Sequence, residues 1–246
     1  MPKLYKVGGC VRDRLLGVKT KDIDFVFVLD DLNKTVQEGF QEMKSWMENE
    51  GFKIFQSVPE MFTIRAKFPK GHKFEGLDAD FVMARKEIGY EEGTRRPILK
   101  LGTLEDDLVR RDFTVNAMAE DEDENLIDLF NGMEDLKNMI LKTPLDARKT
   151  FMDDPLRMIR ALRFLITKGF TIHPTIWVAM RQDDILDKLR QTVSAERIRE
   201  ELCKMMSFNT PATIKLIHDV ENNHCKGFIE LIFGRGLWLK PTFEKR

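Results

Sequence analysis

Two aspartates stand two positions apart near the start of this 246-residue chain, directly before an apolar run. Asp22 and Asp24 precede residues 25–28, whose composition is typical of a buried strand. Alternate strand residues face the same side, so we expect Asp22 and Asp24 to project together while Phe25 enters the core. Such pairs also occur on solvated faces, but a buried strand does not keep two charges without a partner. Because hard oxygen ligands suit Mg²⁺, the pair predicts a magnesium site.

A third carboxylate has the same setting. Asp80 precedes the apolar residues 81–83, just as Asp24 precedes its own run. If the two strands are neighbours, Asp80 joins Asp22 and Asp24 as a catalytic residue of a two-metal site. This chemistry is phosphoryl or nucleotidyl transfer.

A paired glycine, Gly8-Gly9, leads into a predicted helix that carries Arg12. Glycine lets backbone N–H groups approach phosphate oxygens at a helix start, and an arginine adds a charge-assisted contact. Glycine turns are common, so the pair alone is a weak signal. Its short distance in sequence from Asp22 favours a triphosphate-binding turn.

Residues 110–119 combine two arginines, an aspartate, a threonine and an asparagine ahead of an apolar stretch. Arg111, Asp112 and Asn116 are candidates for nucleotide binding. The alternative is the start of a surface helix with ordinary salt bridges.

A predicted helix after Pro155 carries a second cluster of charge. Asp154, Arg157 and Arg160 share one side of it, because positions three apart lie on the same face. A guanidinium beside a carboxylate offers a donor fork and an acceptor, which can match the edge of a base. An ordinary ion pair at the helix start is the alternative for Asp154 and Arg157. Arg163 drifts off this face and is expected to pair locally.

The elements that must position these residues divide the chain in two. Helical periodicity predicts a helix over residues 33–49, with Asn33 as cap and Gly51 as terminator. Strand-like alternation predicts strands over 61–68 and 77–84. Together they indicate an α/β sheet in the first 120 residues. Residues 85–104 are charged and rich in glycine, which predicts a long functional loop. Beyond residue 133 helical signals dominate, including Asp153 or Asp154 as a cap before Pro155, and Ser194 before another helix. We expect a sheet domain over 1–140 and a helical domain over 141–246.

Composition limits the partners. Forty basic and 41 acidic side chains nearly cancel, so contact with RNA must come from local basic patches. Three widely spaced cysteines, Cys10, Cys203 and Cys225, lack metal-ligand spacing and are expected to be reduced thiols. Neither a signal peptide nor a membrane-spanning run is evident, which favours a cytoplasmic protein without a membrane partner. The sequence sets no oligomeric state.

Five motifs in order resemble one family, the class II nucleotidyltransferases that include CCA-adding tRNA nucleotidyltransferases and bacterial poly(A) polymerases. The motifs are GGCVRDRLLG with DIDF (8–17 and 22–25), RRDFTVNAMA (110–119), DLFNG (128–132), DDPLR (153–157) and SAERI (194–198). The resemblance covers about residues 4–205. It implies an α+β fold, in which a polymerase beta-like mixed-sheet head is followed by an all-helical neck and shortened body.

The resemblance also implies roles. Asp22 and Asp24 would hold Mg²⁺, and Gly8, Gly9 and Arg12 would line the triphosphate. The nucleotide-holding residues would be Arg111, Asp112 (at the ribose 2′-OH) and Asn116, and the base-reading residues would be Asp154 and Arg157 with Arg160 and Arg163. The reaction would be attack of the tRNA 3′-OH on the α-phosphate of CTP or ATP. Arg85, Tyr90, Arg95 and Arg96 would lie in the loop tied to the switch from C to A addition.

Two departures from the family pattern stand out. Asp153 replaces the glutamate that opens the base-reading motif, which makes strict C-then-A order less firm than catalysis. Family members usually continue through further helical domains that grip the tRNA elbow, whereas this sequence ends at Arg246. A poly(A)-adding or A-only enzyme is the alternative within the fold. A catalytically idle RNA-binding protein is the alternative from another class, and the intact Asp22/Asp24 pair speaks against it.

Overall fold

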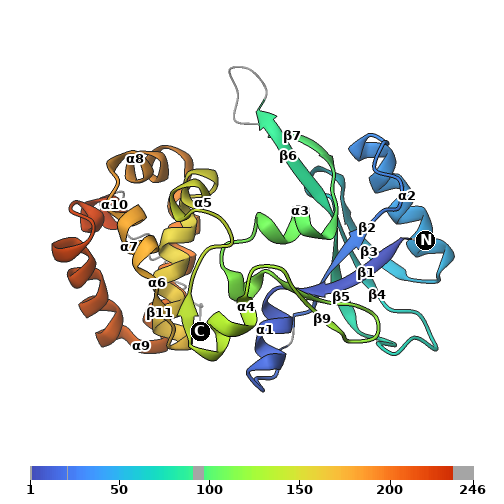
Figure 1. Cartoon of the computed structure of the whole chain (residues 1–246), viewed down its shortest axis with the longest axis horizontal. Coiled ribbons are helices and arrows are strands. Elements are labelled where there is room, and N and C mark those ends of the chain that lie inside the picture. Colours follow the sequence, from blue (N-terminus) through green and yellow to red (C-terminus); the bar gives the residue numbers. More distant parts are fainter. Residues whose placement is uncertain (1, 21, 91–96, 235–246) are drawn as a thin grey trace, which may run out of the picture. The chain divides into compact units, whose positions relative to one another are not determined.

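The computed structural model describes residues 2–20, 22–90 and 97–234 (Figure 1). The chain forms two compact units, Met1–Glu134 and Asp135–Arg246. The expected boundary was residue 140. Within the described part, no helix is long and apolar enough to cross a membrane.

The first unit is built on a mixed seven-stranded sheet with the order β3-β4-β5-β2-β1-β8-β9. Its strands are β1 (Lys3–Val7), β2 (Asp24–Val28), β3 (Lys53–Val58), β4 (Thr63–Lys67), β5 (Asp78–Met83), β8 (Met118–Glu120) and β9 (Leu126–Asp128). β2 and β5 run parallel, and the other neighbours are antiparallel. The strands predicted over 61–68 and 77–84 are confirmed as β4 and β5.

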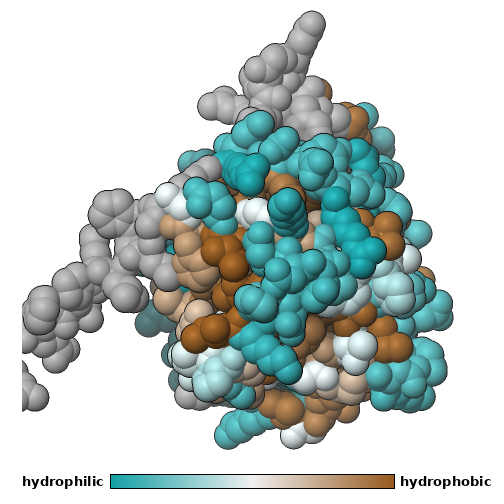
Figure 2. Space-filling view, turned by 90° about the vertical axis from the view of Figure 1, so that its left-hand side faces the viewer, coloured by the Kyte–Doolittle hydropathy of each residue, from teal (hydrophilic) through white to brown (hydrophobic). Residues whose placement is uncertain are grey.

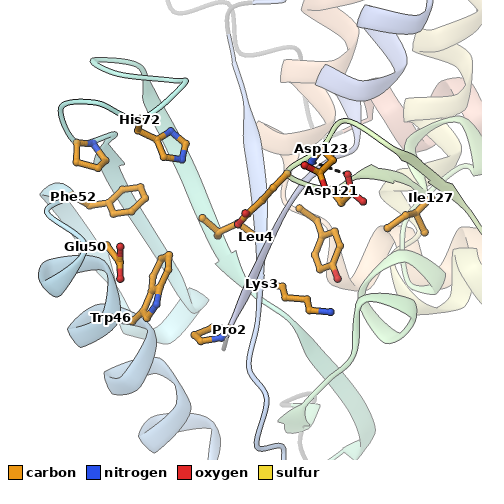
Figure 3. A pocket seen from close by; sticks show the side chains of 13 residues that line it. Pro2, Lys3, Leu4, Trp46, Glu50, Phe52, His72, Asp121, Asp123 and Ile127 are labelled. Atoms are coloured by element: carbon orange, nitrogen blue, oxygen red, sulfur yellow. Dashed lines mark hydrogen bonds between the residues drawn. The ribbon is translucent and has the colours of Figure 1, made fainter.

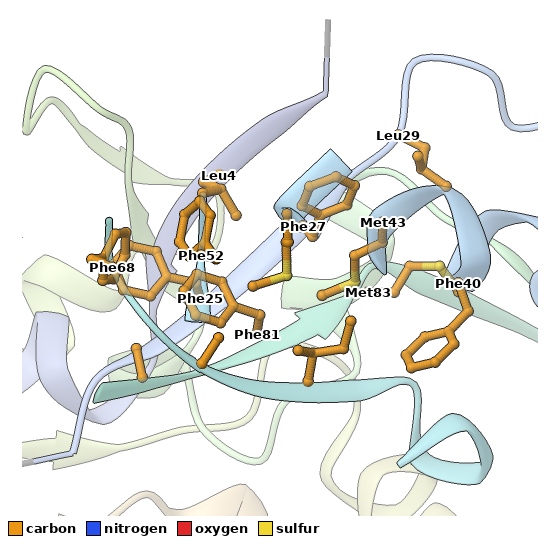
Figure 4. Close-up of a cluster of buried hydrophobic side chains, with 14 of the residues drawn as sticks. Leu4, Phe25, Phe27, Leu29, Phe40, Met43, Phe52, Phe68, Phe81 and Met83 are labelled. Atoms are coloured by element: carbon orange, nitrogen blue, oxygen red, sulfur yellow. The ribbon is translucent and has the colours of Figure 1, made fainter. Parts of the chain in front are cut away.

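One face of the sheet packs against helix α2 (Val36–Asn49). Phe25, Phe27 and Phe81 of the sheet meet Phe40 and Met43 of the helix in a buried core (Figure 4). The predicted Asn33 cap is wrong, because Thr35 is the cap. Its hydroxyl accepts the Glu38 N–H, and the Glu38 carboxylate accepts the Thr35 N–H. This reciprocal arrangement satisfies two helix-end donors, a stabilisation of about 1 kcal/mol. Gly51, at φ 83°, ends the helix as predicted.

The opposite face carries a smaller core of Val7, Val26, Leu108 and Ala119. Helices α1 (Gly9–Leu15) and α3 (Leu104–Val109) belong to this unit, as do the 3₁₀ turns Pro59–Met61 and Thr114–Asn116. Because strand residues alternate, Asp24 shares this face with Val26, while Phe25 lies in the other core.

The predicted loop over 85–104 is largely wrong. β6 (Arg85–Tyr90) and β7 (Pro97–Leu101) pair as an antiparallel hairpin, and α3 then begins at Leu104 behind a Thr103 cap. Gly89 and Pro97 lie within the paired strands and Gly102 directly follows β7, while Gly93 lies outside the described residues. Arg95 and Arg96 lie outside the described residues, and so does the side chain of Tyr90. Arg85 donates to the Met61 carbonyl at 2.9 Å and lies over the Phe62 ring.

The second unit is helical apart from one small parallel pair, β10 (Ile140–Leu141) with β11 (Thr171–Ile172), so the expectation of an all-helical domain needs this correction. Its helices are α5 (Ala147–Asp153), α6 (Leu156–Lys168), α7 (Pro174–Met180), α8 (Asp183–Thr192), α9 (Ala195–Asn223) and α10 (Phe228–Phe233). α4 (Gly132–Lys137) spans the boundary between the units. Figure 2 shows apolar patches scattered among hydrophilic surface on the side that faces left in Figure 1.

Helix α9 is interrupted. Asn209 has non-helical backbone angles and Pro211 follows it. The Asn209 side chain accepts the Ala212 N–H at 3.0 Å, so it caps the segment beyond the kink. α9 is therefore two helical segments joined at Asn209.

Candidate active site

The carboxylates predicted to bind metal come together at one edge of the central strands. Asp24 is the first residue of β2 and is the register partner of Asp80 on parallel β5. The condition set for Asp80, that its strand neighbours that of Asp24, is therefore confirmed. Asp22 lies exposed just before the strand.

The electrostatics of Asp24 reflect this crowding. Burial raises the pKa of Asp24 above its ordinary value, the Arg111 guanidinium opposes the rise, and the charges of Asp80 and Asp22 add to it. Asp80 itself pairs with Arg65 at 3.2 Å. Among the described residues, no group of three or more His, Cys, Asp or Glu side chains is arranged to enclose an ion.

The glycine turn joins β1 to α1. Gly8 has φ 77° and ψ −130°, a conformation that favours glycine. A Cβ on Gly8 would lie 2.6 Å from Nη1 of Arg111, so the absent side chain also makes room for that guanidinium. Gly9 opens α1.

Arg12 is buried, with 6% of its surface exposed. Its Nε and Nη2 donate to Asp13 at 2.9 and 2.7 Å, and Nη1 donates to the Asn116 side chain. Asn116 in turn donates to Asp112 at 2.9 Å. Arg12 therefore links α1 to the 114–116 turn, and its contact with a triphosphate stays a prediction.

The motif over 110–119 is not the start of a surface helix. Arg110 follows the last turn of α3, and Asp112 and Asn116 are 8% and 6% exposed. Asp112 also accepts the Phe113 N–H at 2.9 Å. The alternative of an ordinary surface helix start is therefore wrong.

Asp107 was not among the residues predicted from the sequence. It is completely buried and its carboxylate accepts from both Arg110 and Arg111. Burial opposes its charge, yet the two guanidinium groups hold the pKa of Asp107 below its ordinary value. The signal was present in the sequence, because an aspartate three and four positions before two arginines is ion-pair spacing on a helix.

The DLFNG motif supports the loop that carries these residues. Asp128 accepts the N–H groups of Gly132 and Met133 at 2.8 and 2.9 Å and caps α4. A Cβ on Gly132 would lie 2.3 Å from the Thr114 carbonyl oxygen. Only glycine allows this close approach between the start of α4 and the 114–116 turn.

In the helical unit, α9 contacts several of the base-reading candidates. Asp154 accepts the Leu156 N–H at 3.2 Å and pairs with Arg197 of α9 at 3.2 Å. Arg157 donates to the Thr150 carbonyl at 3.2 Å. Ser194 directly precedes α9, as predicted, and caps it by accepting the Arg197 N–H.

Arg160 and Arg163 both form ion pairs with the buried carboxylate of Glu201, Arg160 at 3.8 Å and Arg163 with a hydrogen bond as well. The expected local partner for Arg163 is wrong, because Glu201 lies 38 positions away on α9. No motif pointed to Glu201, which reaches α6 only through helix packing.

A separate cavity of about 740 Å³ lies in the first unit, bordered by Leu4, Trp46, Phe52 and His72 (Figure 3). Leu4 and Phe52 belong to the core on the α2 face of the sheet. Asp24 and Asp80 project from the other face, so this cavity is not part of the carboxylate site.

The mixed sheet places carboxylates of adjacent strands beside a glycine turn and a loop that carries arginines. This arrangement defines a nucleotidyltransferase-type head domain. The family model described as the poly A polymerase head domain matches residues 4–142. The chain belongs to this family, which confirms the resemblance stated above.

Relatives with similar sequences carry related names. The chain is 35% identical over 225 residues to the multifunctional CCA protein of Pseudomonas fluorescens, covering 88% of this chain and 48% of that protein. It is 33% identical over 213 residues to the mitochondrial CCA tRNA nucleotidyltransferase of Saccharomyces cerevisiae, covering 83% and 38%. The chain thus spans less than half the length of these relatives.

Solved structures agree. The Bacillus stearothermophilus CCA-adding enzyme in complex with CTP aligns with a TM-score of 0.70 and 28% identity, over 92% of this chain and 49% of that one. A tRNA nucleotidyltransferase complexed with a primer tRNA and an incoming ATP analog aligns with a TM-score of 0.66 and 26% identity, over 96% and 61%.

Proposed function

We propose that this protein is a tRNA nucleotidyltransferase that adds C and A residues to the tRNA 3′ end from CTP and ATP, with release of pyrophosphate. The observation that carries the proposal is the pairing of Asp24 with Asp80 across β2 and β5. The positive charge of Arg111 acts on the Asp24 carboxylate. The names of the relatives and the CTP and tRNA complexes of similar structures support the choice of substrates.

The proposed cofactor is Mg²⁺, held by Asp22 and Asp24. The donor set fits, because carboxylate oxygens suit this ion and the crowded charges around Asp24 favour a cation there. When bound, Mg²⁺ would neutralise triphosphate charge and lower the barrier to attack by the 3′-OH. Asp80, next to Asp24 in register, would act as the third catalytic carboxylate.

The proposed nucleotide contacts in this unit start from the glycine turn. Gly8, Gly9 and Arg12 would line the triphosphate, with Arg111 adding its charge. The Gly8 N–H donates to the Met118 carbonyl at 3.2 Å, so Gly8 would allow the close approach and Gly9 would present its backbone N–H. Asp112 would accept from the ribose 2′-OH, with Asn116 bridging it to Arg12 as the hydrogen bonds above suggest. The work of these residues is positioning and charge neutralisation, without a covalent intermediate.

Base choice is proposed to rest on the helical unit. Asp154 would accept from, and Arg157 would donate to, the Watson–Crick edge of cytosine or adenine. Arg160 and Arg163 would complete the pocket from positions set by Glu201. Asp153, one methylene shorter than the family's glutamate, belongs to the same motif. The β6–β7 hairpin is the proposed element of the switch from C to A addition.

The test uses purified protein, Mg²⁺, labelled CTP or ATP, and tRNAs that end at the discriminator base, at C or at CC. We expect two C residues and one A to be added in order. Absence of incorporation on every tRNA would refute the enzyme proposal. Long A tails on generic RNA would instead support a poly(A)-adding enzyme, which uses the same fold. A cytoplasmic location is proposed for the same activity, with fractionation of the native cells as its test.

A further inference from the structure

Both carboxylate oxygens of Asp107 accept hydrogen bonds from arginines. Oδ1 accepts from Arg110, and Oδ2 accepts from Nε and Nη2 of Arg111 at 3.3 and 2.9 Å. The Asp107 side chain has no exposed surface. A buried ion pair is a poor source of stability, since apolar replacements often do as well. The pair therefore calls for a role beyond holding the fold together.

The remaining guanidinium nitrogen of Arg111 faces the glycine turn. A Cβ on Gly8 would lie 2.6 Å from Nη1, so the planar group is confined between Asp107 on one side and the turn on the other. A guanidinium held by two of its nitrogens loses rotational freedom before any ligand arrives. Arg111 is thus fixed in place at the start of α1.

The same guanidinium is also close enough to Asp24 for its positive charge to act on that carboxylate. Arg111 therefore lies within electrostatic reach of both the glycine turn and the proposed metal ligand.

We propose that Asp107 is a positioning residue for nucleotide binding, which holds Arg111 against Gly8 so that an incoming triphosphate meets a cation already in place. The inference rests on the proposed function, because the ligand is its nucleoside triphosphate. Preorganisation of this kind improves affinity by removing the cost of ordering the side chain on binding. Asp107 touches no substrate in this scheme and acts only through Arg111.

The experiment compares Asp107→Asn with Asp106→Asn, a matched control on the same helix. The Asp106 carboxylate accepts the N–H of the cap residue Thr103 and pairs with Lys86, so its substitution weakens α3 without touching Arg111. For Asp107→Asn we expect KM for CTP to rise about tenfold or more, with a smaller loss of kcat. For Asp106→Asn we expect KM to stay within about twofold of the wild type. A merely structural role would lower the active fraction in both variants and leave KM unchanged, and that result would overturn the proposal.

Two additions keep the test decisive. If Asp107→Asn fails to fold, Asp107→Glu keeps the charge but displaces the guanidinium by one methylene, and it should still raise KM. Combining Asp107→Asn with Arg111→Lys should raise KM no further than Arg111→Lys alone, whereas additive effects would contradict action through Arg111.

CTP binding, measured by calorimetry without tRNA, separates the two proposals. Wild-type protein that binds CTP but incorporates none would refute the proposed function, while weaker binding by Asp107→Asn would still support the role of Asp107. Equal binding by both proteins would refute the role of Asp107 alone, and no binding by the wild type would refute both.

Discussion

Asp24 and Asp80 are register partners on the two parallel strands of the central sheet, and each is followed directly by a phenylalanine of the hydrophobic core. Their carboxylates share the face opposite that core, where Asp22 adds a third negative charge. The charges of Asp80 and Asp22 both add to the raised pKa of Asp24, and a bound cation would oppose that effect.

Asp22→Ala and Asp24→Ala should each reduce nucleotide incorporation by about a thousandfold or more, because charge stabilisation by the metal is worth several kcal/mol in the transition state. Steady-state incorporation of labelled CTP into tRNA measures this. Asp78→Ala is the matched control, since Asp78 is an exposed strand residue paired with Lys67. Activity that persists in the Asp24 variant would exclude the metal assignment.

The raised pKa of Asp24 also predicts a pH-dependent effect on stability. The folded state binds this proton more tightly than the unfolded chain, so the stabilising contribution is complete below the ordinary pKa and is lost as pH rises through the raised value. In metal-free buffer, Asp24→Asn should therefore unfold at a higher temperature than the wild type near pH 7, and the gap should shrink towards pH 3.

Calorimetry with and without Mg²⁺ completes that test. Added Mg²⁺ should raise the melting temperature of the wild type and have little effect on Asp24→Asn, because only the wild type offers the charged ligand. A variant less stable than the wild type at neutral pH without metal would contradict the electrostatic picture.

Arg157→Ala should blur the choice between CTP and ATP more than it weakens RNA binding. The donor fork is lost, and rejection of the wrong base depends on leaving polar groups unpaired. The ratio of kcat/KM for CTP and ATP on a tRNA ending in CC is the measurement. Unchanged selectivity would count against the base-reading role, and Arg148→Ala, an exposed pair with Asp184 in the same unit, is the control.

Glu201→Gln should destabilise the helical unit by about 3–5 kcal/mol, because it leaves the guanidinium groups of Arg160 and Arg163 without their buried counter-charge. Urea unfolding measures the change. Glu200→Gln, at an exposed neighbouring position, should shift the free energy of unfolding by less than about 0.5 kcal/mol. Equal effects of the two substitutions would show that the Glu201 pairs are not important.

The three cysteines should differ in reactivity. Cys203 is exposed, whereas burial raises the pKa of Cys225 to about 12 and also raises that of Cys10. Since the thiolate is the reactive form, iodoacetamide at pH 8 should label Cys203 first. Peptide mass spectrometry gives the order, and early labelling of Cys225 would contradict its burial.

Local patterns predicted the parts of the fold that depend on local physics. The alternation after Asp24 and the glycine at position 51 were enough to place a strand and a helix end. Asn33 was predicted as the cap of α2, whereas Thr35 and Glu38 form the capping box there, and their spacing is visible in the sequence. The β6–β7 hairpin was missed because its glycines and proline are typical of loops.

The rest of the site depends on partners distant in sequence. Gly8 meets Arg111, Arg12 meets Asn116 and Arg163 meets Glu201 only after strands and helices have packed. A spacing rule within one helix cannot reveal such pairs. Asp107 is the exception, because its spacing to Arg110 and Arg111 is helical and was visible in the sequence.

The interruption of α9 at Asn209 limits how far one helical geometry extends. Arg197 and Glu201, which hold Asp154 and Arg163, both lie on the segment before the kink, and the segment after it starts with its own cap. The helix that positions these two partners is therefore continuous only up to the kink.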